Sequence, residues 1–164
     1  MKTKIVQMVA LTFGLILAAA LQDLAPGFAG VKPPFLIAGA LFAALTAPLV
    51  TALAFAVVAG LVCDALAGVS SFAATGFFVL LALAGHYARA GAYADEAPPR
   101  GMVGAFAVPV AAALAEVWFA ICGVNDVGLL VGICAAAIWG VPVGAGLFAL
   151  LPVVGRHIGW EEST

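Results

Sequence analysis

The chain has 164 residues, of which 66% are hydrophobic and only 9% are charged. A water-soluble surface needs about 25–35% charged residues, so this composition predicts an integral membrane protein. The net charge of −2 excludes the basic surface on which nucleic-acid binding depends. The three cysteines are odd in number and lie in apolar runs, which fits neither a disulfide framework nor a zinc site, and we expect no metal and no cofactor.

Six apolar segments follow one another along the chain, separated by short breaks rich in glycine, proline and polar residues. They are too long or too continuous for alternating strands, so each predicts a helix. We therefore expect a single all-α domain, a compact bundle of about six transmembrane helices. The predicted helices are Ile5–Leu21, Phe35–Ala47, Leu49–Ala67, Phe72–Ala88, Met102–Cys122 and Val127–Leu151.

The first apolar segment follows Lys2 and Lys4 and ends near three alanines at 18–20, a pattern that a cleaved secretory signal also shows. Its 17 residues exceed a typical signal-peptide core and suffice to span a membrane, so we expect it to remain as the first span. Small residues recur every fourth position along it and form a candidate docking face for another membrane helix. They are Ala10, Gly14 and Ala18.

The second segment, Phe35–Ala47, is either a short span or a re-entrant segment, because its 13 residues rise only about 20 Å against a hydrocarbon core of about 30 Å. Six spans with an inside N-terminus place five of the six basic residues in the cytoplasm. A re-entrant second segment leaves two inside and four outside. Since Lys and Arg favour cytoplasmic loops, the sequence predicts six spans with both termini cytoplasmic.

Two acids, Asp64 and Glu116, lie well inside predicted spans, where a charged side chain costs about 2.5–3.5 kcal/mol at the helix centre. In this topology both lie roughly 21–22 Å along outward-running helices and share a level in the outer half of the membrane. Asp64 lies between Gly60 and Gly68 on one helix face, where small neighbours let a second helix approach. Three roles stay open: hydrogen bonds from the start of the fourth helix around 70–72, a cavity for a cation or polar solute, or contact with a partner protein.

Enzyme motifs are missing from the chain, which has no Gly-x-Ser-x-Gly, no His-Glu-x-x-His and no Gly-rich phosphate loop ending in Lys. A serine nucleophile would need a base, and His86 is predicted at the opposite membrane face from Ser70 and Ser71. The sequence therefore favours a protein that is not an enzyme.

The order of features over residues 33–89 is similar to that of a known family. The stretch KPPFLIAGALFAALTAP runs into a helix ending AGLVCDALAG, and the next helix closes with LLALAGHYAR. This resembles the MreD family of bacterial rod-shape-determining membrane proteins, whose signature is Gly-Leu-x-x-Asp-x-x-x-Gly. The matching residues are Gly60, Leu61, Asp64 and Gly68. Phe72 stands where members often carry a further glycine, and the first and last two helices match only in length and hydrophobicity.

The resemblance implies a non-enzymatic subunit of the wall-elongation machinery in the bacterial cytoplasmic membrane. Its expected partners are an MreC-like protein and the elongation glycosyltransferase and transpeptidase. MreD proteins are similar in fold to the substrate-binding S components of energy-coupling-factor vitamin transporters, and that function is the alternative. In the alternative, the small-residue stripe of the first helix docks a coupling subunit and the two acids line a vitamin pocket.

Overall fold

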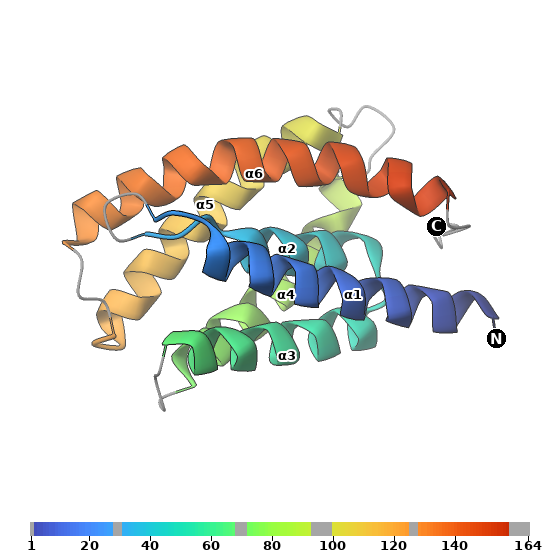
Figure 1. The fold of residues 1–164 in the computed structure, drawn as a ribbon, viewed down its shortest axis with the longest axis horizontal. Coiled ribbons are helices and arrows are strands. Elements are labelled where there is room, and N and C mark those ends of the chain that lie inside the picture. Colours follow the sequence, from blue (N-terminus) through green and yellow to red (C-terminus); the bar gives the residue numbers. More distant parts are fainter. Residues whose placement is uncertain (1, 28–30, 68–71, 93–99, 125–127, 158–164) are drawn as a thin grey trace.

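The computed structural model describes residues 2–27, 31–67, 72–92, 100–124 and 128–157. This part of the chain forms six α-helices that run alternately in opposite directions, so α1 begins and α6 ends at the same end of the bundle (Figure 1). The helices are α1 (Lys2–Leu24), α2 (Phe35–Thr46), α3 (Leu49–Ala67), α4 (Ala73–Ala92), α5 (Arg100–Ile121) and α6 (Leu129–His157).

Three of these helices are long and apolar enough to cross a membrane, judged by length and composition within the described residues. They are α3, the Gly101–Ile121 part of α5 and the Leu129–Val153 part of α6. Shorter apolar helices occupy Thr12–Leu24 and Phe35–Thr46. The structure therefore has the all-helical fold that the composition predicted, and its apolar helices indicate a membrane protein.

The short helix α2 lies at the centre of the bundle and packs against all five other helices. Nine of its 12 residues are buried, and its length of about 18 Å follows from a rise of 1.5 Å per residue. Pro34, which precedes its first turn, makes no side-chain hydrogen bond that would cap the helix. The side chain of Gln22 in α1 takes that role, because its Oε1 accepts a hydrogen bond from the N–H of Leu36 at 3.1 Å.

Two apolar clusters surround α2. One joins it to α3 and α4 around Leu36, Phe55 and Phe78, and the other joins it to α5 and α6 through Phe42 and Phe148. The rings of Phe42 and Phe148 meet edge to face with centroids 5.4 Å apart. The bundle thus consists of two helix pairs, α3–α4 and α5–α6, held together across α2.

The α5–α6 pair is packed closely enough that backbone meets backbone. A Cβ at Gly140 of α6 would lie 2.8 Å from the backbone nitrogen of Pro109 in α5, and Gly104 and Gly144 face each other in the same way. Such contacts exclude any side chain larger than hydrogen, and close approach of this kind is how helices associate in lipid.

Candidate functional site

Asp64 lies one turn before the end of α3 and is buried, with 5% of its surface exposed. Its carboxylate accepts hydrogen bonds from the N–H of Ala74 at 2.9 Å, the N–H of Thr75 at 3.0 Å and the hydroxyl of Thr75 at 2.8 Å. Both N–H groups belong to the first turn of α4, where backbone donors have no partner inside the helix. Asp64 therefore caps α4 from the neighbouring helix.

Gly60, one turn earlier on the same face, makes this cap possible. A Cβ at Gly60 would lie 2.9 Å from the backbone nitrogen of Thr75 and 3.1 Å from its hydroxyl oxygen, so only glycine lets α4 come this close. Of the three roles that the sequence left open for Asp64, hydrogen bonds from the start of the fourth helix are present in the structure. Their donors are Ala74 and Thr75 rather than residues around 70–72, and Gly68, Ser70 and Ser71 lie outside the described residues.

Phe72 precedes α4 and has a φ of +51°, in the left-handed region that costs a residue with a side chain about 1–2 kcal/mol. Glycine adopts this conformation without a steric penalty. The start of α4 is also held from the other helix pair, because the indole N–H of Trp118 in α5 donates to the carbonyl of Ala73 at 2.8 Å.

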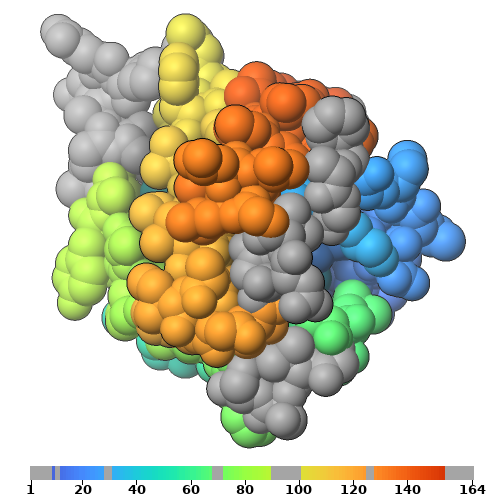
Figure 2. Space-filling model, turned by 90° about the vertical axis from the view of Figure 1, so that its left-hand side faces the viewer, coloured from blue at the N-terminus to red at the C-terminus, as the bar shows by residue number. Residues whose placement is uncertain are grey.

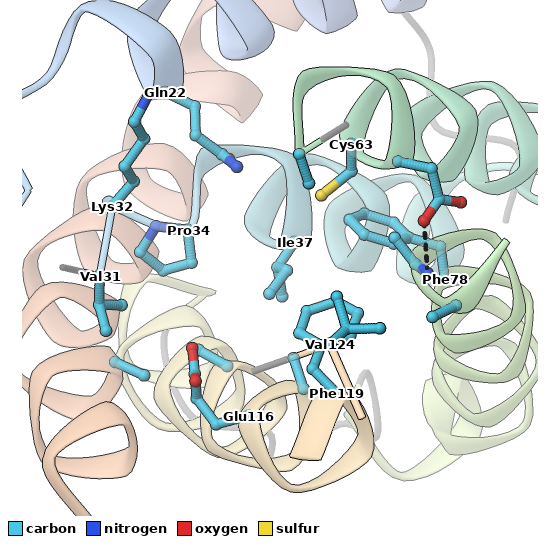
Figure 3. A pocket seen from close by; sticks show the side chains of 17 residues that line it. Gln22, Val31, Lys32, Pro34, Ile37, Cys63, Phe78, Glu116, Phe119 and Val124 are labelled. Carbon is cyan, nitrogen blue, oxygen red and sulfur yellow. Dashed lines mark hydrogen bonds between the residues drawn. The ribbon is translucent and has the colours of Figure 1, made fainter. Parts of the chain in front are cut away.

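A cavity of about 290 Å³ lies between the two helix pairs and is lined by both acids, Asp64 and Glu116 (Figure 3). Gln22 and Lys32, from the end of α1 and the stretch before α2, supply further polar groups. Figure 3 shows Glu116 and Phe119 across the cavity from Cys63, with the side chain of Gln22 extending inward. The apolar walls include Val31, Pro34, Ile37, Phe78, Ala112, Ala115, Phe119 and Ala136.

Glu116 is half-buried on α5, and its position depends on a glycine of α6. A Cβ at Gly132 would lie 2.7 Å from Oε2 of Glu116. The carboxylate therefore rests against the α6 backbone, and any side chain at position 132 would displace it. The structure thus places Asp64 and Glu116 on one cavity, but it gives them different surroundings: Asp64 is bonded to α4 and Glu116 is packed against α6.

Gln22 and Lys32 are site residues that the sequence analysis did not select. The ammonium of Lys32 lies 2.9 Å from Oδ1 of Asp23 and 3.2 Å from the Asp23 carbonyl oxygen. Gln22 and Lys32 stand in the break between the first two predicted helices, on the outer side toward which the two acids are predicted to lie. That common side of the predicted membrane was the available signal.

The residues of the small-residue stripe on α1 have different surroundings in the structure. Ala18 packs partly against the core around α2, whereas a Cβ at Gly14 would meet nothing within 4 Å. Gly14 and Ala18 line an apolar groove of about 120 Å³ together with residues of α2, α3 and α6. The side chain of Ala10 lies outside the described residues.

Among the described residues, no group of three or more His, Cys, Asp or Glu side chains is placed to hold a metal ion. The three cysteines are free thiols. Figure 2 views the end of the bundle at which α5 ends and α6 begins. Of the three cysteines, Cys122 and Cys134 are exposed and Cys63 is half-buried.

Together, the fold and the cavity define a helical, membrane-type protein with a partly polar site between two helix pairs. The chain matches no family model, no curated protein and no solved structure.

Proposed function

We propose that this chain is an MreD-like, non-enzymatic subunit of the wall-elongation machinery, with six spans in the bacterial cytoplasmic membrane. Its partners are an MreC-like protein and the elongation glycosyltransferase and transpeptidase. The observation that carries the proposal is the bonding of Asp64, the acid of the matched signature: both of its oxygens are engaged by the first turn of α4. An acid used in this way fixes a helix hairpin and presents a defined surface, which is the task of an assembly subunit.

The backbone at Phe72 also supports the resemblance. Members of the family often carry a glycine at this position, and the φ of +51° is one that glycine adopts freely. The backbone conformation at the start of α4 is therefore one that a glycine, as in the family, adopts without strain.

The direction of the helices supports the proposed topology. Because α1 begins and α6 ends at the same end of the bundle, both chain ends fall on one side of the membrane if each helix crosses it (Figure 1). The excess of basic residues near those ends favours the cytoplasm for that side.

The proposal is tested in cells whose rod shape depends on this chain. We expect Asp64→Ala to reduce co-purification of the MreC-like partner and to give rounded cells at equal membrane levels of the variant. Asp23→Asn, an acid at the exposed end of α1, serves as the matched control and should leave both unchanged. If cells that carry Asp64→Ala stay rod-shaped and the MreC-like partner still co-purifies, the proposal is wrong. Asp64→Asn separates the charge from the hydrogen bonds, since it keeps one acceptor oxygen.

A second function is favoured by the cavity itself. A void of about 290 Å³, with four polar side chains among its described lining residues and with apolar walls, has the character of a small-ligand site, as in the solute-binding S component of a transporter. That function requires a coupling ATPase. Co-purification of a Walker-type ATPase with the tagged chain, in place of wall-synthesis proteins, would favour transport over wall elongation.

A further inference from the structure

The α5–α6 pair meets the rest of the bundle along a boundary of limited contact. Among the described residues, α5 and α6 are far more closely associated with each other than with any other helix. Cα atoms of α5 approach those of α2 and α4 within 8 Å, and those of α6 approach α2, but neither helix comes this close to α1 or α3. Figure 1 shows α6 and α3 along opposite edges of the bundle. Because α5 and α6 are consecutive, the chain crosses this boundary once, between Ala92 and Arg100.

On each side of the boundary the helices are packed too closely to slide past one another. The contacts of Gly140 and Gly104 lock α5 to α6, and that of Gly60 locks α3 to α4. A Cβ at Gly85 in α4 would lie 2.9 Å from the Cβ of Ala44, which joins α2 to the same body.

Contacts across the boundary are looser and are made by side chains. A Cβ at Gly76 in α4 would lie 3.6 Å from Cζ2 of Trp118 in α5, an ordinary van der Waals distance. Helices joined by close backbone contacts move together, whereas side-chain contacts between such bodies allow small shifts. We therefore expect α5 and α6 to behave as one body and α2, α3 and α4 as another.

The cavity beside Asp64 and the apolar groove beside Gly14 both lie on this boundary. The cavity of about 290 Å³ has Asp64 and Phe78 on one side and Phe119 of α5 on the other. The groove of about 120 Å³ separates Leu147 of α6 from residues of α1, α2 and α3. Protein interiors are generally packed as densely as organic crystals, so a boundary that contains voids is where movement breaks the fewest contacts.

Contacts of two kinds cross the boundary. The rings of Phe42 and Phe148 meet edge to face within a buried apolar cluster, and apolar contacts of this kind are not directional. The hydrogen bond from the indole N–H of Trp118 to the carbonyl of Ala73 is 2.8 Å long and depends on distance and angle. Ala73 also lines the cavity, so widening the cavity at this point breaks the hydrogen bond.

We propose that α5 and α6 move as one body against the rest of the bundle, turning about the contact of Phe42 with Phe148, so that the cavity has a closed and a wider arrangement. The hydrogen bond from Trp118 to Ala73 belongs to the closed arrangement and favours it. Hinge motions of this kind take microseconds to milliseconds. A ligand or partner that binds one arrangement better shifts the population toward it. The inference goes beyond the wall-elongation proposal and does not depend on it.

Double electron–electron resonance tests the motion, because it measures distances between two spin labels in a frozen sample that retains both arrangements. The full chain is used in phosphatidylcholine nanodiscs, with its three cysteines replaced by alanine. One label pair spans the boundary, at Leu66→Cys on α3 and Leu130→Cys on α6, and the control pair lies within one body, at Ile121→Cys and Leu130→Cys. All three positions are exposed. We expect two distances for the first pair and a single distance for the control pair.

Two tryptophan variants test the hydrogen bond. Trp118→Phe keeps an aromatic ring and removes the donor, and should raise the ratio of the wider to the closed population about two- to tenfold, as the net loss of one hydrogen bond does. Trp139→Phe is the matched control, because the buried indole N–H of Trp139 has no acceptor in the described part of the chain. It should leave the ratio unchanged. Circular dichroism checks that both variants are folded.

The native Cys63 gives a second measurement, in a chain whose other cysteines are replaced by serine. Because Cys63 lines the cavity, Trp118→Phe should raise the rate of its reaction with N-ethylmaleimide by a similar factor. The proposal is overturned if the Leu66–Leu130 pair shows one narrow distance in the parent and in Trp118→Phe, or if the two tryptophan variants have the same effect on the population. No partner protein is present, so either failure leaves the wall-elongation proposal to its own test.

Discussion

Asp64 acts at the residue scale as a helix cap supplied from another helix. Replacing it by alanine leaves the buried N–H of Ala74 and the partly buried N–H of Thr75 without this acceptor, and each unsatisfied donor costs up to about 1–3 kcal/mol. We expect Asp64→Ala to lower the free energy of unfolding in detergent by roughly 2–4 kcal/mol, and Asp64→Asn to lower it by less, because Asn keeps an acceptor oxygen.

The measurement is denaturant unfolding followed by circular dichroism, with Asp23→Asn as the control. The exposed ion pair of Asp23 with Lys32 is worth little in water, so this variant should unfold like the parent. Equal stability of Asp64→Ala and the parent would show that the cap does not contribute to the fold.

Phe72 is expected to be a site where a substitution stabilises the protein. Its left-handed backbone costs about 1–2 kcal/mol, while its side chain is 63% exposed and contributes little burial. Phe72→Gly should therefore raise the free energy of unfolding by about 0.5–1 kcal/mol, after the greater entropy that glycine has in the unfolded chain is deducted. Gly123, with a φ of +71° and open space around it, is the reverse control: Gly123→Ala should lower stability.

The sequence predicted the site residues whose chemistry is unusual inside a membrane span. It did not predict the residues that matter only because of their contacts in the folded protein. Asp64 and Glu116 were selected because ionisable groups are rare inside spans. Gly132 was not, since glycine is abundant here and only the contact with Glu116 distinguishes it. Lys32 stood in a connecting segment, and the sequence does not show that its side chain lines the same cavity as the acids.

At the scale of elements, the close packing of α5 against α6 requires glycine at positions where any side chain would clash with the facing helix. A Cβ at Gly140 would lie 2.8 Å from the nitrogen of Pro109, so Gly140→Ala must separate the helices and should cost about 1–3 kcal/mol. Gly146 on the same helix has nothing within 4 Å, and Gly146→Ala should be neutral or stabilise by up to about 1 kcal/mol through helix propensity. Thermal unfolding of the two variants in detergent compares them, and equal melting temperatures would contradict this account.

The ends of the helices were predicted less well from the sequence than their positions along the chain. Each of the six apolar segments forms a helix, but α1 and α6 extend beyond the predicted ends, α6 as far as His157. The prediction ended the sixth helix at Leu151, before Pro152, yet the helix continues through this proline as it does through Pro142. A missing N–H ends a helix in water more readily than in a bundle where neighbours support the backbone.

At the scale of the whole molecule, the proposed six-span topology places the α2–α3 and α4–α5 connections in the cytoplasm. Truncated fusions to green fluorescent protein after Thr46 and after Gly91 should fluoresce, because this reporter matures on the cytoplasmic side. An alkaline phosphatase fusion after Gly123 should be active, because that enzyme requires the outside. An external position for Gly91 would indicate that α2 re-enters, and it would remove the argument that both acids lie in the outer half.

The central position of α2 has a consequence for how the protein is made. This helix is synthesised before α5 and α6, yet one side of it is completed by Val108 of α5 and by Val143 and Phe148 of α6. Until α5 and α6 have been made, that side of α2 lacks its protein neighbours, and the helix, about 18 Å long, is shorter than a hydrocarbon core of about 30 Å. A chain cut short before α6 therefore lacks the packing of Val143 and Phe148 against α2, and the membrane's quality-control proteases would meet an incomplete bundle.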